Sequence, residues 1–401
     1  MERVILHCDC NCFYASVEAA LNPKLNKYAF AVCGDPEFRH GIILAKNEKA
    51  KRYGVQTGEP IYQARSKCPG LITVKAHHEI YKEYSKRIFD IYCRYTELVE
   101  PFGLDECWLD VSGSQKLFGS GKEIADEIRE VVKNEVGVTI SVGVSFNKIF
   151  AKMGSDYRKP DATTEITKEN FRELLYKLPA GDMFTIGRRT AERLRVLGIH
   201  TIGDVAEADE KILQRILGEN GRKIWQYVNG YDYSPVHPFD YREAYKSIGN
   251  GITFKRDLVS TGDVRTCVFF LCDKVAARLR KHKVECSALQ VGIKDKAFNT
   301  MSRSVQLAAP TDLSYDLRQT ALELIYANID VCRTPIRAIT VTGTKLLNSD
   351  EIYEQISFFD LDYYIKREKE QRLECTRDKI RHKYGLGTLT RCSFIENEFG
   401  F

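Results

Sequence analysis

The sequence predicts a multidomain α+β protein. Two stretches, residues 3–157 and 247–345, show patterning in the same succession: strand, helix, two strands, helix and strand. The stretch between them has helical patterning. At 401 residues the chain is too long for one simple core, so two to four domains are expected.

The first stretch opens with a strand that leads through a turn into a helix. Residues 3–8 (RVILHC) predict a buried strand that closes at Asp9, and FYASVEAAL at 13–21 has helical spacing, stopped by Asn22 and Pro23. The turn between them leaves backbone N–H groups unpaired at a helix N-terminus. Such a place binds anions readily.

A small mixed segment and a second acidic turn follow. Residues 28–74 combine two short strands, AFAVC and GIILA, with a basic helix over 47–53. After a helix over 79–97, VEPFGLDECWLDVS predicts two strands with a turn between them. Asp105 and Glu106 therefore lie at a turn, where adjacent side chains can reach one ion, as they cannot inside a regular strand.

The rest of the first stretch completes a ferredoxin-like split βαβ domain. An amphipathic helix over 120–136, the strand TISVGVS at 139–145 and a helix over 148–157 follow in order. This succession places Asp9 and the acidic turn at neighbouring strand ends.

Three carboxylates from two segments form the main candidate site. Asp9, Asp105 and Glu106 repel one another, and a divalent cation bound between them is the usual reason for such convergence. The alternating cysteines of CDCNC could instead indicate zinc. No second cysteine or histidine pair completes a tetrahedral set, so zinc is disfavoured.

The middle stretch, residues 168–236, predicts a helical domain with two glycine turns, TIGRRTA and GENGRK. A glycine turn beside cationic side chains lets backbone N–H groups approach a DNA phosphate. A plain connection between bundle helices is the alternative for each turn, and the tandem arrangement leaves both open. The residues concerned are Gly187, Arg188, Arg189, Gly221 and Arg222.

The second βαββαβ stretch carries the positive charge of the protein and predicts a second ferredoxin-like unit. Residues 240–345 hold 17 Lys and Arg against 11 Asp and Glu, whereas the whole chain has a net charge of +5. A basic module suits the phosphate backbone of a nucleic acid. An ordinary solvated surface is the alternative.

Composition argues for a cytoplasmic protein. No segment reaches the roughly 20 apolar residues that a membrane span needs, and the N-terminus lacks the layout of a signal peptide. The 13 cysteines are odd in number and scattered, which favours reduced thiols over a disulfide framework.

Six motifs follow one another along the chain. They are Asp9-x-Asn11-x-Phe13-Tyr14-Ala15-x-Val17-Glu18, Gly103-Leu104-Asp105-Glu106-x-x-Leu109-Asp110, Ser145-x-Asn147-Lys148-x-x-Ala151-Lys152, Lys159-Pro160, Lys246-Ser247-Ile248-Gly249 and Thr253-Phe254. Taken together they resemble the Y-family (translesion) DNA polymerases, and among these the bacterial DinB/UmuC-like branch. The resemblance covers residues 3 to about 345 in unbroken order.

The resemblance implies the right-handed architecture of a polymerase, with low fidelity and no proofreading. The implied domains are a catalytic ferredoxin-like palm at 1–27 and 75–167, small fingers at 28–74, a helical thumb with helix-hairpin-helix turns at 168–236, a βαββαβ little finger at 240–345, and a C-terminal tail at 346–401.

The resemblance also implies the catalytic chemistry. Asp9, Asp105 and Glu106 would hold two Mg²⁺ ions, with Mn²⁺ as a substitute, helped by the backbone carbonyl of Cys10. One ion would lower the pKa of the primer 3′-hydroxyl, and the other would bind the triphosphate. In-line phosphoryl transfer needs this charge neutralisation rather than a protein nucleophile.

The implied nucleotide contacts are the N–H groups of Cys12, Phe13 and Tyr14, with Lys159 as a cationic clamp. Tyr14 would be the sugar gate that selects deoxynucleotides; a core aromatic at a helix start is its alternative. Three positions depart from the family pattern. Glu48 and Lys51 stand where the family often has Tyr and Arg, and Gly103, where a Ser is common, is expected to loosen its turn.

The implied partners are primer–template DNA, dNTPs and the bacterial sliding clamp, with the chain itself a monomer. The expected DNA contacts are Gly187, Arg188, Arg189, Gly221, Arg222, Lys246, Lys255 and Arg256. The expected clamp-binding peptide is Gln355-Ile356-Ser357-Phe358-Phe359, in which a glutamine and apolar side chains would dock into a pocket. A charged helix over 361–384 follows; it either packs on the chain's own surface or docks a partner.

Three functions from different classes compete. A template-directed translesion DNA polymerase fits all the motifs. A nucleotidyl cyclase would share the palm and its carboxylates, but the glycine turns and the basic module argue against it. A catalytically silent scaffold that binds DNA and the clamp is opposed by the intact carboxylate set.

Overall fold

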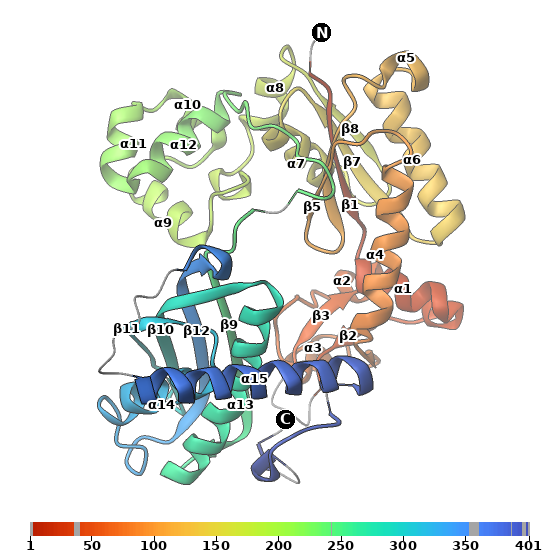
Figure 1. Cartoon of the computed structure of the whole chain (residues 1–401). Coiled ribbons are helices and arrows are strands. Elements are labelled where there is room, and N and C mark those ends of the chain that lie inside the picture. Colours follow the sequence, from red (N-terminus) through yellow and green to blue (C-terminus); the bar gives the residue numbers. More distant parts are fainter. Residues whose placement is uncertain are drawn as a thin grey trace. The chain divides into compact units, whose positions relative to one another are not determined.

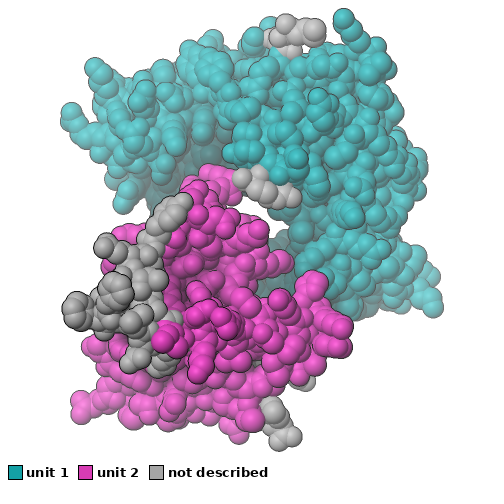
Figure 2. Space-filling view, viewed as in Figure 1, with its two compact units in different colours: residues 1–34, 42–242 teal, residues 35–41, 243–401 magenta. Residues whose placement is uncertain are grey.

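The computed structural model describes residues 3–35, 41–241, 243–352, 361–385, 387–394 and 398–399. The chain divides into two compact units, Met1–Gly34 with Ile42–Arg242, and Asp35–Gly41 with Glu243–Phe401 (Figure 2). The predicted α+β multidomain class is confirmed (Figure 1). Among the described residues, every helix is too short or too polar to cross a bilayer.

A five-stranded sheet, in the order β5-β6-β1-β7-β8, forms the centre of the first unit. The central strand β1 pairs antiparallel with β6 and β7, and β8 runs parallel to β7. The first four strands have the ferredoxin-like order, whereas the edge strand β8 was not predicted. The strands are β1 Ile5–Cys10, β5 Val99–Phe102, β6 Glu106–Asp110, β7 Ile140–Ser145 and β8 Thr163–Ile166.

Helices cover both faces of this sheet. Leu6, Cys8 and Cys10 on one face of β1 pack into the core with α4 and α6, whereas Ile5 and Asp9 on the other face meet α7. All six residues of β1 are therefore buried. The helices around this sheet are α1 Phe13–Leu21, α4 His78–Tyr92, α5 Gln115–Phe118, α6 Gly121–Val136 and α7 Lys148–Tyr157.

Helix α4 is shorter than predicted. It ends at Tyr92 rather than Glu97, because the chain turns there, with hydrogen bonds from Arg94 N to Ile91 O and from Tyr95 N to Tyr92 O. The turn buries Tyr95 in the core. Packing of one aromatic side chain thus overrides helical patterning.

Two glycines let α7 lie directly on the sheet. A Cβ on Gly143 of β7 would stand 1.9 Å from Ala151 O and 2.4 Å from Ser155 N of α7. A Cβ on Gly154 would stand 2.9 Å from Gly143 Cα. Only glycine allows backbones to approach so closely, and this approach brings the α7 side chains to β1.

A small three-stranded sheet, ordered β3-β2-β4, forms the inserted segment. Strand β4 pairs parallel with β2 and ends at Lys75, one residue past the predicted boundary. Neither β4 nor the helix before it was predicted. The elements are η1 Pro23–Lys27, β2 Phe30–Cys33, β3 Ile43–Lys46, α2 Glu48–Arg52, α3 Ile61–Lys67 and β4 Ile72–Lys75.

A helical region completes the first unit and packs on α7. Phe150 of α7 shares a core with Leu194 and Leu213 of this region. The elements are α8 Phe171–Leu175, η3 Ala180–Asp182, α9 Arg188–Val196, α10 Ile202–Glu207, α11 Glu210–Leu217 and α12 Glu219–Val228.

The second unit holds a four-stranded antiparallel sheet in the order β11-β10-β12-β9. The predicted βαββαβ succession is present, but this strand order is not ferredoxin-like. The first strand β9 lies at an edge, and the fourth, β12, fills the centre. The elements are β9 Ser247–Leu258, α13 Thr261–Lys281, β10 Val284–Asp295, β11 Thr300–Thr311, α14 Ser314–Tyr326 and β12 Ile336–Asn348.

The charged helix of the tail, α15 Leu361–Tyr384, has the predicted bounds and packs on the chain's own surface. Glu374 is buried, lies 2.8 Å from Arg280 Nη2 of α13 and accepts a hydrogen bond from Ser314 Oγ. Short turns η4 Ser349–Glu351 and η6 Cys392–Phe394 flank α15. The predicted clamp-binding residues 355–359 lie outside the described residues.

Candidate active site

The strand register brings the first and third carboxylates together. Asp9 lies directly opposite Glu106 across β1 and β6, so both side chains are on the face that α7 covers. Asp9 is buried, and Glu106 is partly buried. The predicted convergence of these two residues therefore follows from antiparallel pairing.

The second carboxylate, Asp105, ends the turn between β5 and β6. Its backbone carbonyl accepts a hydrogen bond from Cys10 N at 2.9 Å, which ties the turn to the end of β1. Gly103 has φ 90°, where glycine is unstrained, so it fits the turn rather than loosening it. Burial, and then repulsion from Asp9 and Glu106, raises the pKa of Asp105 to about 6.

Two lysines neutralise the carboxylates. Lys152 Nζ on α7 lies 3.0 Å from Asp9 Oδ2 and 2.7 Å from Glu106 Oε2. Lys159 Nζ lies 2.8 Å from Asp9 Oδ2. Both ammonium groups also contact Asp156, at 3.3 and 2.7 Å. The sequence interpretation placed Lys159 beside the triphosphate, and for Lys152 it left open a contact with template or primer phosphates or a solvated position on its helix.

A buried histidine stands behind Glu106. His7 has no exposed surface, and its Nε2 lies 3.3 Å from Glu106 Oε2. Its Nδ1 lies 2.8 Å from Ser155 Oγ on α7. Burial, above all, lowers the pKa of His7, which keeps the ring neutral. For Glu106, burial acts to raise the pKa, but the close contacts with His7 and Lys152 lower it to about 2.

These donor atoms suit a hard divalent cation. Ligand atoms of His7, Asp9 and Glu106 lie within 4.8 Å of one another, and carboxylate oxygens dominate the set. The ammonium of Lys152 lies between two of these carboxylates, so positive charge is stabilised there. Asp105 adds a third carboxylate beside them.

The predicted anion cradle has the expected local geometry. Cys12 precedes α1 with φ 49°, and its side chain caps none of the N–H groups at the start of that helix. Asn11 ties the cradle to the loop after α7, because its Oδ1 accepts from Asp161 N and its Nδ2 donates to Ser141 Oγ, each at 2.9 Å. This loop carries Lys159.

Tyr14, the predicted sugar gate, is partly buried against the core and stacks on a neighbouring ring. Its ring stacks on Tyr81 at a centroid distance of 4.2 Å. The Tyr81 hydroxyl donates to Glu18 Oε1 at 2.5 Å, and His77 Nδ1 lies 2.8 Å from the same oxygen. Burial and the nearby Asp105 charge raise the pKa of Tyr14.

The two atypical residues of the inserted segment contact each other. Lys51 Nζ lies 3.5 Å from Glu48 Oε1, and the Cys12 thiol donates to the same oxygen at 3.5 Å. Glu48 therefore lies beside the anion cradle, paired with the cation that the sequence interpretation assigned to the triphosphate.

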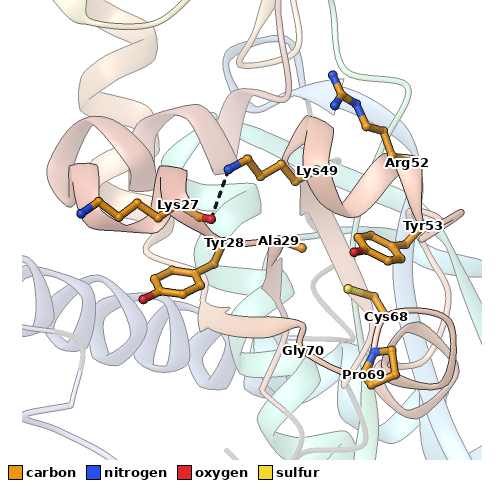
Figure 3. Close-up of a pocket in the computed structure, with 9 residues that line it drawn as sticks. All are labelled: Lys27, Tyr28, Ala29, Lys49, Arg52, Tyr53, Cys68, Pro69 and Gly70. Carbon is orange, nitrogen blue, oxygen red and sulfur yellow. Dashed lines mark hydrogen bonds between the residues drawn. The ribbon is translucent and has the colours of Figure 1, made fainter.

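The inserted segment also contains a hollow of about 570 Å³. Tyr28 and Tyr53 stand on opposite sides of it, and Lys49 Nζ donates to Lys27 O (Figure 3). None of the carboxylates or cradle residues lines it. The lining residues are Lys27, Tyr28, Ala29, Lys49, Arg52, Tyr53, Cys68, Pro69 and Gly70.

The two predicted glycine turns differ. Gly187 precedes α9 with open space around it, and Arg188 is 92% exposed with Glu192 beside it at 3.2 Å. Gly221, by contrast, is buried inside α12, and its N–H donates to Gly218 O. Its N–H is therefore already paired within the chain, and the DNA contact at this residue stays a prediction.

Three of the remaining predicted DNA contacts have ion-pair partners within the chain. Arg222 Nε lies 3.4 Å from Glu210, and Lys246 Nζ lies 3.6 Å from Glu243. Arg256 forms ion pairs of 2.9 Å with both Asp263 and Glu398, so it fastens the C-terminal segment to β9. Arg189 and Lys255 complete the predicted set.

His7, Ser155 and Asn11 were missed by sequence reasoning. A signal existed for His7, because residues two apart on a strand share a face and His7 precedes Asp9 by two. No pattern in the sequence shows that α7 lies on that face.

Comparison with known proteins identifies the family. Residues 8–156 match the impB/mucB/samB family, and residues 245–358 match the C-terminal domain of that family. A DNA polymerase IV of Acetivibrio thermocellus is 46% identical over 99% of this chain and 98% of its own length. DNA polymerase IV 1 of Bacillus subtilis is 34% identical over 99% of this chain and 94% of its own length.

A solved structure shows the same fold. A Y-family DNA polymerase chimera superposes with a TM-score of 0.75 at 23% identity, covering 86% of this chain and 99% of its own. These matches do not favour a cyclase or a silent scaffold. The chain therefore belongs to the Y-family DNA polymerases, in the DinB-like DNA polymerase IV branch.

Proposed function

We propose that this translesion DNA polymerase transfers the nucleoside monophosphate of a dNTP to a primer 3′-hydroxyl, with release of pyrophosphate, at Asp9, Asp105 and Glu106, which would hold two Mg²⁺ ions. The observation that carries the proposal is the Asp9–Glu106 pair across β1 and β6, bridged by the Lys152 ammonium. Bound there, the ions would lower the pKa of the 3′-hydroxyl and neutralise the triphosphate. The Cys10 carbonyl would complete the ligand set.

The chain's own residues orient the nucleotide. The N–H groups of Cys12, Phe13 and Tyr14 face the phosphates at the start of α1, where the helix dipole favours negative charge. Lys159, already beside Asp9, reaches the triphosphate as a point charge. The Tyr14 ring, fixed by its stacking on Tyr81, excludes a ribose 2′-hydroxyl.

The domain roles follow the same proposal. The five-stranded sheet and its helices act as palm, the three-stranded segment as fingers, α8 to α12 as thumb, and the βαββαβ part of the second unit as little finger. Primer–template DNA and dNTPs are the substrates. The sliding clamp as partner of residues 355–359, and the monomeric state, stay predictions.

Primer extension tests the carboxylate assignment. With Mg²⁺ and all four dNTPs, the wild type is expected to extend a primed template, and Asp105→Ala is expected to lose at least about 100-fold in rate, because charge stabilisation of the transition state is removed. Asp110→Ala, in the same strand pair but outside the cluster, is the control. Extension by Asp105→Ala at the wild-type rate would remove this residue from the metal site.

A further inference from the structure

A buried chain of polar groups links α7 to Glu106 from behind. Ser155 Oγ is hydrogen-bonded to His7 Nδ1 at 2.8 Å, and on the other side of the ring His7 Nε2 and Glu106 Oε2 face each other at 3.3 Å without hydrogen-bond geometry. His7 has no exposed surface, and Ser155 is 1% exposed. Water therefore cannot substitute for either contact, so the orientation of the imidazole depends on these two neighbours.

The chemistry of the neighbours decides the tautomer of the ring. An ionised carboxylate accepts hydrogen bonds and cannot donate, whereas a serine hydroxyl does either. A His7 ring that faces Glu106 therefore carries a proton on Nε2, and the Ser155 hydroxyl, which can donate or accept, satisfies Nδ1. The opposite tautomer would set two acceptors against each other in a buried place.

We propose that His7 and Ser155 are positioning residues for Glu106, holding its carboxylate oriented toward the metal ions. The proposal rests on the metal site proposed above. Partners that orient a ligating carboxylate contribute about 10–100-fold to metal affinity or activity. His7 acts through Nε2–H on Glu106, and Ser155 acts through Nδ1 of His7.

Only Glu106 receives such support. Lys152 contacts both Asp9 and Glu106, so it cannot fix one of them independently of the other. Among the three carboxylates, Glu106 is the one at ion-pair distance from the imidazole, whose ring also packs against Trp108 at a centroid distance of 5.1 Å. The close approach of α7 at Gly143 holds Ser155 in place.

Nuclear magnetic resonance tests the geometry without any metal. In the full-length chain labelled with ¹⁵N-histidine, one of the 8 histidines is expected to show the neutral Nε2–H pattern and to vanish in His7→Gln. Ser155→Ala is expected to shift the Nδ1 resonance of this ring. A His7 ring that carries its proton on Nδ1 would overturn the proposal.

Metal binding tests the consequence. Mn²⁺ alone, followed by electron paramagnetic resonance, is expected to bind Ser155→Ala and His7→Leu about 10-fold more weakly than the wild type. His7→Gln, whose amide keeps an N–H near the Nε2 position, is expected to restore part of the affinity. Ser145→Ala is the control, since it also removes a buried hydroxyl, one that donates to Ile166 O at 2.7 Å.

The two proposals fail in different ways. Unchanged Mn²⁺ affinity in Ser155→Ala and His7→Leu would refute the positioning role while leaving the polymerase mechanism intact. A wild type that extends no primer would instead refute the mechanism. If His7→Leu does not fold, Ser155→Ala and the ring spectrum decide. The KM for dNTP is expected to stay constant, because the cradle is untouched.

Discussion

The five-stranded sheet and the four-stranded sheet repeat one succession of elements but are covered differently. In the first, helices lie on both faces, and every residue of β1 is buried. In the second, α13 and α14 share one core with alternate strand residues, and most residues of β11 are exposed. The carboxylates Asp9 and Glu106, with Lys152 beside them, therefore lie on the five-stranded sheet, whose second face is covered by α7.

The difference shows what each sheet can do. A cluster of carboxylates needs fixed partners and little competing water, and α7 supplies both to β1. A sheet face that no helix covers instead presents partly exposed polar side chains at alternate positions, such as Gln290 and Lys294 of β10. The second unit places its buried charges elsewhere, between its helices and α15.

The largest expected effect concerns those charges of the second unit. Glu374→Ala removes the buried carboxylate between Arg280 and Arg377, which keep only Asp378 and Asp273 as ion-pair partners, so the unfolding free energy of this unit is expected to fall by about 3 kcal/mol, the lower end for a broken buried pair. Denaturant unfolding monitored at Trp108 and Trp225, both in the first unit, is expected to stay unchanged. Glu368→Ala, exposed on the same helix, is the control. A weakened first unit would contradict the separation of the two cores.

The next largest effect comes from a substitution that disturbs the packing of α7 on the five-stranded sheet. Gly143→Ala forces α7 away from β7, and overpacking of this kind costs about 1–3 kcal/mol or more. Thermal unfolding is expected to show the loss in the first unit, together with loss of primer extension. Gly113→Ala, where a Cβ meets nothing within 4 Å, is expected to change neither. Normal activity in Gly143→Ala would mean that the position of α7 is not critical.

A smaller effect concerns phosphate contacts of the second unit. Lys246→Ala is expected to weaken binding to primer–template DNA uniformly across sequences and to reduce the slope of log affinity against log salt by about 1. Fluorescence anisotropy at several salt concentrations measures both. Lys116→Ala, on α5 of the first unit, should leave the slope as it is. An unchanged slope for Lys246→Ala would exclude this residue from the interface.

The smallest effect tests the atypical contact in the inserted segment. Glu48→Gln removes a negative charge beside the anion cradle and releases Lys51, so the KM for dNTP is expected to fall about 2- to 5-fold with kcat unchanged. Steady-state single-nucleotide insertion measures both constants. Glu79→Gln breaks a similar exposed pair with Lys82 and should have no effect. A higher KM would mean that Glu48 helps to bind the nucleotide.

Much of the fold was predictable because its signals are local. The bounds of α1, α7 and α15 match their patterns, since helical spacing and stop residues are written in neighbouring positions. Strand β8 was not predicted, and the prediction of the β3-β2-β4 sheet lacked β4. Strands of four residues are difficult to predict because they carry little periodicity. The predicted end of α4 was wrong, because the chain leaves the helix at Tyr92 in order to bury Tyr95.

The sequence by itself determined the family, the succession of elements and the three carboxylates with their cradle, because motifs of neighbouring residues specify these features. Only the tertiary structure decided the order of strands in the second sheet, the contact of Glu48 with Cys12, and the placement of Lys152, His7 and Ser155 around Glu106. These depend on residues far apart in the chain. Which strand fills a central position, and which helix closes a face, follows from packing that no local pattern encodes.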